Sequence, residues 1–391
     1  MRLEQFRNYR HLDLALGPGM HIFAGANAQG KTNLLEAIYL SATGHSPRTG
    51  QESELIAWDA EVARVVTEFA SERRGNFTIE VSLGRKSSGA GSEARRGGTA
   101  DSSMRRGSAA EKRIKVNGVT RTAADLAGLA PVVLFLVGDL EIVRGEPARR
   151  REFLDTDLSV MSRTYLWAWR QYNRVLDQRN RLLKDIRDGL APAADLPPWD
   201  AQLAAFGGRL LEVRLRFVAD LNGQTVPVYR GLSASDQEMT VAYRREWGDP
   251  ETAATTRDAL AALLAGAIEE SVEEEIRRGT TLVGPHRDDL QILVGGKDAR
   301  FFGSQGEQRT AAVALRVAEC GLLRQLVEEW PVLLLDDIFS ELDRTRRAAL
   351  LGYLTPLAQV ILTTTDVDAI GLPPDADAHV YQVSQGTVAE K

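Results

Sequence analysis

Cysteine and histidine are scarce in this sequence. Cys320 is the only cysteine among 391 residues, so the chain cannot form an internal disulfide, which favours a reducing compartment. The five histidines are scattered and show no metal-ligand spacing. The sequence also has no basic-then-apolar leader and no apolar run of about 18 residues, so we expect a cytoplasmic protein without a membrane partner.

An excess of positive charge is missing too. Lysine and arginine number 48 against 54 aspartates and glutamates, which gives a formal net charge of −6. The average field therefore repels phosphate, and any contact with nucleic acid must come from a local basic patch. The hydrophobic fraction of 43% and the charged fraction of 26% are typical of a globular protein, and the length allows two or three domains.

Residues 25–39, GANAQGKTNLLEAIY, place a glycine-rich turn in front of a helical pattern. Gly25, Gly30, Lys31 and Thr32 fit the spacing G-x-x-x-x-G-K-[ST], and the apolar residues before them supply the strand that this motif needs. The backbone N–H groups of such a turn bind phosphate oxygens, the lysine reaches the β- and γ-phosphates, and the threonine ligates Mg²⁺. The stretch predicts a nucleoside triphosphate site; the alternative is an ordinary glycine turn before a helix.

The segment from Arg85 to Arg113 is dense in Ser, Gly, Ala and Arg and nearly devoid of large apolar residues. It cannot bury enough surface to offset the entropy of ordering, so we predict a long flexible loop. Residues 62–70 and 76–84 before it are rich in β-branched side chains, and residues 113–121 carry an Asn-Gly turn typical of a hairpin. The loop is therefore predicted to extend from a β-sheet.

Beyond Asp155, apolar residues recur at steps of three and four residues, which is the spacing of a helix face. One seam runs from Tyr165 to Ile186 with Arg179 as its polar member, and a second runs from Trp199 to Phe217 after a proline-rich break. A third helical stretch covers 260–276 and ends at Gly279, after which residues 281–294 have strand-like composition. Aromatic residues at 167, 169 and 172 could stack on bases, although helix packing is the more ordinary role.

Residues 330–343, WPVLLLDDIFSELD, form an apolar run that ends in two carboxylates. A buried strand would present Asp336 to hold Mg²⁺ directly or through water, and Asp337 to orient or deprotonate an attacking water. Ser340 to Asp343 looks like the loop by which one ATPase subunit meets its partner. The alternative is an acidic turn after a core strand.

Between these motifs, residues 302–319 contain a short glycine turn that opens a helix. SQGEQ, Ser304 to Gln308, resembles the signature motif of the ABC class of ATPases. In that class the signature helix caps the γ-phosphate held by the other subunit, so one chain supplies half of each site. A serine-capped helix without a partner is the alternative.

Six blocks of the sequence together resemble the RecF family of DNA replication and repair ATPases, which are related to the SMC proteins. The blocks span nearly the whole chain and read LEQFRNYRHLDL, GANAQGKTNLLEAIYL, EPARRREFLD, LVGPHRDDL, FGSQGEQRT and LLLDDIFSELD. The resemblance implies an α/β fold, an ABC-type P-loop ATPase head with an inserted helical, coiled-coil-like arm. We expect the two parts of the head at 1–155 and 279–391 and the arm at 156–278.

The resemblance also implies roles for residues. Lys31 and Asp337 would be catalytic, Thr32 and Asp336 would hold the metal, and Ser340 and Asp343 would lie in the dimer-facing loop. ATP would contact Gly25, Ala26, Asn27, Ala28, Gln29, Gly30, Lys31, Thr32 and Asn33. The signature that acts on the partner's ATP would comprise Ser304, Gln305, Gly306, Glu307 and Gln308. DNA phosphates would have Arg149, Arg150 and Arg151 as candidate contacts, although an exposed helix start explains these arginines equally well.

Three features depart from the family pattern. Ala26 and Ala28 stand where Glu and Gly are usual, which narrows the backbone freedom near the β-phosphate. LFLVGDLEIV replaces a proline-containing segment, so Asp139 is not assigned to ATP. Transporter-type ATPases carry glutamate at the place of Asp337 and a histidine after the next strand. Here that strand leads to Thr364, Thr365 and Asp366, which predicts slow hydrolysis.

The resemblance implies an ATP-dependent DNA clamp in recombinational repair. ATP and Mg²⁺ would drive head dimerisation on double-stranded, gapped or junction DNA, and weak, DNA-stimulated hydrolysis would release it. The partners would be RecR, and indirectly RecO and RecA, with a role in replication and the SOS response. Two alternatives stay open: the ATPase subunit of a transporter, and a P-loop kinase that needs neither signature nor dimer.

Overall fold

The computed structural model describes residues 1–85, 110–233, 235–248, 255–373 and 376–391. The chain divides into two compact units. Unit 1 comprises residues 1–136, 329–340 and 354–391, and unit 2 comprises residues 137–328 and 341–353. The sequence assigns 137–155, 279–328 and 341–353 to the head, whereas the contacts group them with the helices of the arm, so the two divisions differ. Among the described residues, no helix is both long and apolar enough to cross a bilayer.

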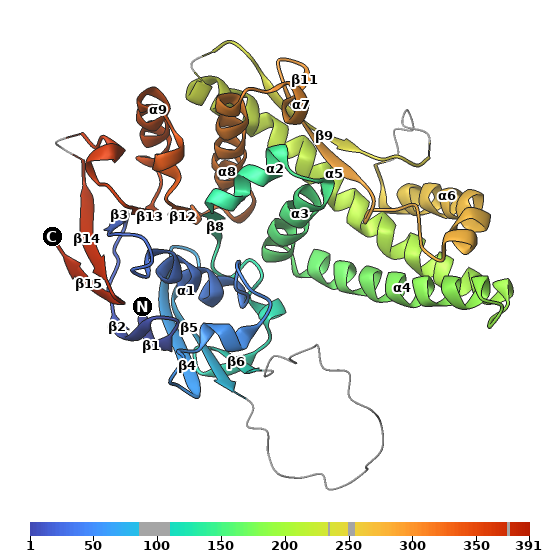
Figure 1. Ribbon diagram of the computed structural model, residues 1–391, viewed down its shortest axis with the longest axis horizontal. Helices are drawn as coiled ribbons and strands as arrows, with labels where there is room; N and C mark the ends of the chain where they lie inside the picture. The colour runs from blue at the N-terminus through green and yellow to red at the C-terminus, as the bar shows by residue number, and fades with distance from the viewer. Residues whose placement is uncertain (86–109, 234, 249–254, 374–375) are drawn as a thin grey trace, which may run out of the picture. The chain divides into compact units, whose positions relative to one another are not determined.

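Unit 1 contains a six-stranded sheet built from both ends of the chain (Figure 1). Its order is β15-β14-β3-β13-β12-β8, and all neighbours are parallel except the edge strand β15. The strands are β3 (Gly19–Ala24), β8 (Val132–Phe135), β12 (Val332–Asp336), β13 (Gln359–Thr364), β14 (Ala378–Ser384) and β15 (Thr387–Glu390). Because parallel strands end at the same edge, the residues after β3, β12 and β13 come together there.

A second, antiparallel sheet of unit 1 has the order β2-β1-β4-β5-β6-β7. Its strands are β1 (Arg2–Phe6), β2 (Tyr9–Asp13), β4 (Val62–Ser71), β5 (Gly75–Arg85), β6 (Ala110–Val116) and β7 (Val119–Arg121). The helix α1 (Lys31–Thr43) contacts strands of both sheets, and a shared core of Leu, Ile, Val and aromatic side chains lies around it. This core fixes the start of α1, where the phosphate loop lies.

The predicted hairpin is confirmed: β6 pairs with β7, and Asn117 and Gly118 have φ values of 49° and 80°. Both positive values suit the tight turn that Asn-Gly favours. The predicted loop is wrong at its ends, because Arg85 belongs to β5 and residues 110–113 belong to β6, where ladder hydrogen bonds order them. The rest of that prediction, residues 86–109, lies outside the described residues.

Unit 2 is mainly helical. Its helices are α2 (Glu141–Arg144), α3 (Pro147–Met161), α4 (Arg163–Arg187), α5 (Pro197–Ser233), α6 (Arg257–Arg278), α7 (Ala299–Phe302), α8 (Gln305–Val327) and α9 (Arg344–Leu354), of which the last residue belongs to unit 1. A small sheet has the order β11-β10-β9, with β9 (Met239–Arg244), β10 (Asp289–Val294) and β11 (Lys297–Asp298). The chain also has 3₁₀ turns η1 (Glu52–Leu55), η2 (Ala123–Leu126), η3 (Val137–Leu140), η4 (Ala193–Asp195), η5 (Ile338–Glu341) and η6 (Asp368–Ile370).

The three predicted arm helices are confirmed as α4, α5 and α6. The helix α5 continues well past the predicted seam, through Pro227, because further apolar residues such as Leu221 and Val228 are buried along it. The helix α6 ends at Gly279, which has φ +67°. The predicted strand at 281–294 forms only from Asp289, as β10, and residues 281–288 form a loop.

Arg179, the polar member of the predicted seam, is fully buried. Its guanidinium lies 2.6 Å from Asp200 and 2.7 Å from Glu275, and it donates to Thr281 at 2.8 Å. One cation therefore joins α4, α6 and the start of α5.

Candidate nucleotide-binding site

The phosphate loop follows β3 directly and ends where α1 begins. Two positions of this loop require glycine because neighbouring atoms leave no room for a Cβ. A Cβ at Gly25 would lie 2.4 Å from the carbonyl oxygen of Val383, and Gly30 has φ +115° with the Asn8 side chain 2.5 Å from the place of a Cβ. Ala28 also has a positive φ of 65°, a conformation in which glycine would be free of strain. The loop thus keeps its shape despite the alanine.

Lys31 lies inside this loop. Only 7% of its surface is exposed, and its ammonium donates to the carbonyl oxygens of Gly25 and Ala26 at 2.7 and 2.9 Å. Burial lowers the pKa of Lys31, while the nearby carboxylates of Asp337 and Asp336 act in the opposite direction. The cation is therefore held across the loop, where the β- and γ-phosphates of a triphosphate would lie.

Thr32, Asp336 and Thr363 form a hydroxyl–carboxylate group beside the loop. The Thr32 hydroxyl lies 2.8 and 2.9 Å from the two oxygens of Asp336, and the Thr363 hydroxyl donates to Asp336 at 2.7 Å. A hydroxyl and a carboxylate are the hard oxygen donors that Mg²⁺ prefers. Within the described part of the chain, no group of three or more His, Cys, Asp or Glu could hold a metal. A Mg²⁺ here would keep water and phosphate oxygens as its other ligands, so the donor set fits the ion.

Asp337 follows the strand in a left-handed turn with φ 52°. Its backbone N–H donates to the carbonyl and hydroxyl oxygens of Thr363, at 3.2 and 3.1 Å. Two hydrogen bonds thus stabilise a conformation that non-glycine residues adopt infrequently, and such positions are common at functional sites. Asp337 and Lys31 are close enough for the carboxylate to act on the lysine pKa.

Two segments that the motif does not include also support the loop. Asn8 donates to the carbonyl oxygen of Gln29 at 2.9 Å, and the Tyr9 hydroxyl donates to that of Gly30 at 3.0 Å. The backbone N–H of Gln385 donates to the Gln29 side chain at 2.8 Å. The spacing of the phosphate-loop motif does not predict these contacts, although Asn8 and Tyr9 belong to one of the six blocks.

Asn33, predicted to contact ATP, makes protein contacts at both ends of its amide. The nitrogen donates to Asn8 at 2.8 Å and the oxygen accepts from Arg48 at 2.9 Å. Its role toward ATP stays a prediction.

The signature residues lie at the start of α8, in unit 2. Ser304 caps the helix: its side chain accepts from the backbone N–H of Glu307 at 3.3 Å, and the Glu307 carboxylate accepts from the backbone and hydroxyl of Ser304 at 2.8 Å each. These hydrogen bonds lower the pKa of Glu307. Ser304 and Gln305 are exposed. The predicted helix start is confirmed, and the motif stands at the positive end of its dipole.

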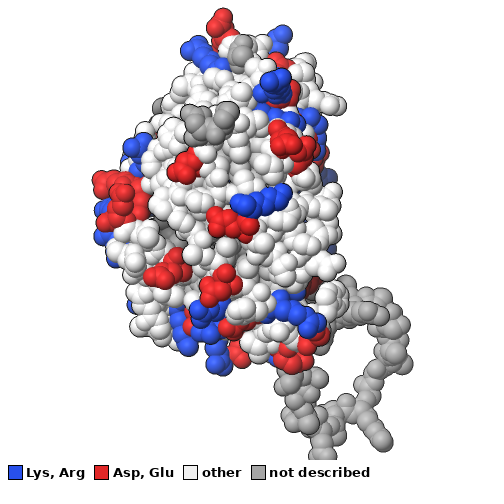
Figure 2. Space-filling view, turned by 90° about the vertical axis from the view of Figure 1, so that its left-hand side faces the viewer, with Lys and Arg blue, Asp and Glu red and all other residues white. Residues whose placement is uncertain are grey.

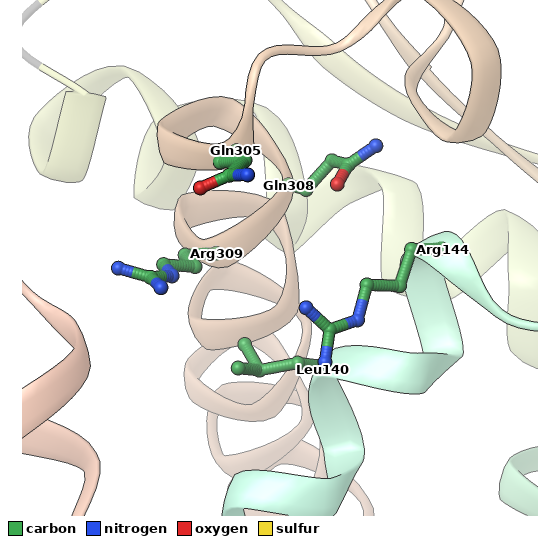
Figure 3. Close-up of a pocket in the computed structure, with 5 residues that line it drawn as sticks. All are labelled: Leu140, Arg144, Gln305, Gln308 and Arg309. Atoms are coloured by element: carbon green, nitrogen blue, oxygen red, sulfur yellow. The ribbon is translucent and has the colours of Figure 1, made fainter.

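A polar pocket of about 190 Å³ lies beside this first turn (Figure 3). Gln305, Gln308 and Arg309 line it from α8, and Leu140 and Arg144 line it from the facing segment. The amide of Gln308 donates to the carbonyl oxygens of Ala299 and Arg300 and so ties α8 to α7.

Part of the predicted dimer-facing loop, Glu341 to Asp343, lies beside the predicted signature within unit 2. Arg346 pairs with Asp343, and its guanidinium would lie 3.3 Å from a Cβ on Gly306. Arg309 pairs with Glu341 at 3.1 Å. Separately, in unit 1, the Ser340 hydroxyl donates to the carbonyl oxygen of Asp337 at 2.6 Å. The sequence alone did not predict the link between signature and loop.

The three candidate DNA arginines make different contacts. Arg150 is 4% exposed, and its guanidinium binds both carboxylate oxygens of Asp289, at 2.7 and 2.9 Å. It is not accessible to a phosphate, so its assignment to DNA is wrong: the arginine holds α3 against β10. Arg151 donates to the carbonyl oxygen of Asp288 at 2.9 Å, and the exposed Arg149 pairs with Glu152 at 2.9 Å.

The pairing of Arg150 with Asp289 joins two of the six blocks, EPARRREFLD and LVGPHRDDL, within unit 2. Arg214 donates to the carboxylate of Asp155 at 2.5 Å and to the carbonyl oxygen of Pro285 at 2.7 Å. Burial raises the pKa of Asp288 to about 6, although this carboxylate accepts from Tyr243 and Trp247. These contacts therefore join the two blocks within unit 2.

Known proteins match this chain over its whole length. Residues 1–388 match the family described as RecF/RecN/SMC N terminal domain. A DNA replication and repair protein RecF from Heliobacterium modesticaldum is 38% identical over 100% of this chain and 98% of its own length. The RecF of Chloroflexus aurantiacus is 39% identical over 99% of this chain and 97% of its own length. The chain belongs to the RecF family.

Solved structures agree with the family. The recombination mediator protein RecF with ATP, described as part of the RecFOR pathway, has a TM-score of 0.83 and 31% identity, and covers 100% of this chain and 96% of the other. An SMC head bound to the C-winged helix domain of ScpA, with a TM-score of 0.54 and 16% identity, shares only the fold. The predicted ABC-type head with a helical arm is confirmed. Membership in the RecF family gives no support to the transporter and kinase alternatives.

Proposed function

We propose that this protein binds Mg²⁺ and ATP between two copies of itself and so closes as a clamp on DNA during recombinational repair of gapped or stalled replication. The pairing of Thr32 with Asp336 carries the nucleotide part of this proposal. The hydroxyl and the carboxylate that would bind the metal lie beside the phosphate loop, and Lys31 of that loop is held by hydrogen bonds. The proposed ligand is therefore a triphosphate with its cation.

The sharing of ATP between copies is proposed from the signature. Ser304 and Gln305 are exposed at the N-terminus of α8, which suits a phosphate presented by a second molecule. If Lys31 of one copy and Ser304 of the other contact the same ATP, the nucleotide binds the dimer better than the monomer. ATP must then drive association by linkage.

Hydrolysis is proposed to be slow, DNA-stimulated and used for release. Asp337 offers a shorter carboxylate than glutamate would. The Thr364 hydroxyl, at the end of β13, donates to the carbonyl oxygen of Asp366, in the region where transporter-type ATPases have a histidine. With these groups, positioning of water is weaker than in a fast ATPase.

The cellular role is proposed from the relatives. They are named DNA replication and repair proteins, and the solved RecF structures belong to the RecFOR pathway. We therefore propose cooperation with RecR, and indirectly with RecO and RecA, on gapped or junction DNA in the cytoplasm, including the SOS response.

A mixing experiment tests the shared site. Lys31→Ala and Ser304→Arg proteins should each be inactive, but a mixed dimer has one intact site. Each mixed dimer has one intact site of two, so activity should return to between about a quarter and a half of wild-type ATPase. The control is Lys31→Ala mixed with the double variant Lys31→Ala/Ser304→Arg, which has no intact site. Return of activity in neither mixture would contradict the proposal.

A further inference from the structure

Many exposed cations of the described chain are paired with carboxylates. Arg149 pairs with Glu152, and both Arg277 and Arg278 pair with Glu274. On the face shown in Figure 2, basic and acidic side chains lie interspersed. Paired charges of this kind present little net attraction to a phosphate backbone, so a DNA contact requires cations without partners.

The helix α4 carries four such cations. Arg170, Arg174, Arg181 and Lys184 are exposed, and their side chains form no ion pair or hydrogen bond with the residues that the structure describes. Their spacing of four, seven and three residues places them on one face of the helix. The opposite face packs on α5 and α6, and Figure 1 shows α4 along an edge of unit 2.

A fifth cation joins this face from α5. The guanidinium of Arg209 lies over the ring of Trp167, 5.4 Å from its centre, and Phe206 meets the ring edge-on at 5.5 Å. Trp167 is 46% exposed and lies on α4 one turn before Arg170. The indole is thus half covered by its own unit and holds Arg209 beside the row of cations.

The charge balance of this face is positive. Two exposed carboxylates, Asp177 and Asp185, lie on α4, so the five cations leave a net charge of +3. By contrast, α6 exposes Glu269, Glu270 and Glu273. Unit 2 therefore has a basic helix that differs from its acidic neighbour.

We propose that the α4 patch, defined as Arg170, Arg174, Arg181, Lys184 and Arg209, binds the phosphate backbone of double-stranded DNA. This inference rests on the proposed clamp function and supplies its DNA contact. From Arg170 to Lys184 the helix rises about 21 Å, which equals about six base-pair steps of duplex. A row of separate cations suits a repeating phosphate backbone, whereas the centre of a protein interface is depleted of charge.

The test compares two triple variants with the same loss of charge. Arg170→Ala/Arg174→Ala/Arg181→Ala removes three patch cations, and Arg257→Ala/Arg277→Ala/Arg278→Ala removes three paired arginines of α6. Binding of a fluorescent 30-base-pair duplex is followed by anisotropy with a non-hydrolysable ATP analogue between 50 and 300 mM NaCl. The patch variant should bind at least about tenfold more weakly at 100 mM, with a salt slope shallower by about 2 to 3. The α6 variant should stay within about twofold of wild type.

Several results separate this inference from the clamp proposal. Wild-type affinity for DNA in the patch variant would overturn the inference and leave the clamp proposal standing, as would equal weakening in both variants. Loss of binding to an acidic protein with DNA affinity intact would assign the patch to a protein partner instead. No binding of the duplex by wild type would overturn both. Unchanged thermal unfolding and ATP binding in the patch variant show that its fold is intact.

Discussion

The Thr32 hydroxyl lies 2.8 and 2.9 Å from the two carboxylate oxygens of Asp336, although 304 residues separate them in the chain. The contact joins the start of α1 to the end of β12, at the edge where parallel strands of unit 1 terminate. It is the point at which the two ends of the chain form one candidate site.

Removal of the Thr32 hydroxyl should weaken ATP binding only when Mg²⁺ is present. In Thr32→Ala the metal loses a protein oxygen, so the affinity for ATP with Mg²⁺ should fall about 10- to 100-fold. With EDTA the variant and wild type should differ little. Thr32→Ser keeps the hydroxyl and is the matched control. Titration with a fluorescent ATP analogue measures both, and equal Mg²⁺ effects in Thr32→Ala and Thr32→Ser would show that the hydroxyl is no ligand.

Loss of the buried arginine in the arm should destabilise the protein strongly. Arg179→Ala leaves the fully buried Glu275 without its cation, and breaking such a pair costs about 3 to 5 kcal/mol. Arg277→Ala removes an exposed pair on α6 and should change the urea midpoint little, because water screens such a pair. Urea unfolding of the two variants measures the difference. Similar midpoints would mean that Arg179 does not join the arm helices.

Two groups of one loop should make opposite contributions to stability between about pH 4 and 6. The pKa of Asp288 is raised to about 6 in the folded protein, so its contribution is present below the unfolded value near 4 and is lost as pH rises through 6. Burial lowers the pKa of His286 to about 4 from its usual 6.5, so the unfolded chain binds the extra proton and stability rises with pH over the same window.

Single substitutions separate the two contributions. Asp288→Asn removes the contribution that decreases as pH rises. Between pH 4.5 and 6.5 the free energy of unfolding of this variant should therefore increase by about 2 kcal/mol relative to that of wild type. His286→Asn removes the contribution that increases with pH, so its free energy of unfolding should decrease relative to that of wild type over the same pH range. Urea midpoints at the two pH values provide the measurement. If both variants follow the wild-type profile, neither group titrates as the structure indicates.

Local patterns were enough to predict the elements that form the candidate nucleotide site. A strand, a glycine-rich turn and a helix with Lys31 and Thr32 form one continuous segment. In a parallel sheet, a buried strand that ends at Asp336 ends at the same edge as the strand before this turn. The contact of Asn8 with Gln29 could not be predicted, because it depends on how a separate turn of the antiparallel sheet lies against the phosphate loop.

The arginine run shows why surface roles were harder to predict. Consecutive helical residues point about 100° apart, so Arg149 and Arg150 cannot share a face. Which of them is buried depends on Asp289, 139 residues further along the chain. The cations of the α4 patch have the regular spacing of one helix face, but only the structure shows that their side chains have no partners among the described residues.

The mass of the protein in solution, measured by light scattering with and without Mg²⁺ and a non-hydrolysable ATP analogue, tests the shared nucleotide site most directly. Wild type should change from the mass of one chain to that of two when the analogue is added, and Ser304→Arg should bind the analogue but keep the mass of one chain. A wild-type protein that binds the analogue fully and remains a single chain would contradict the account.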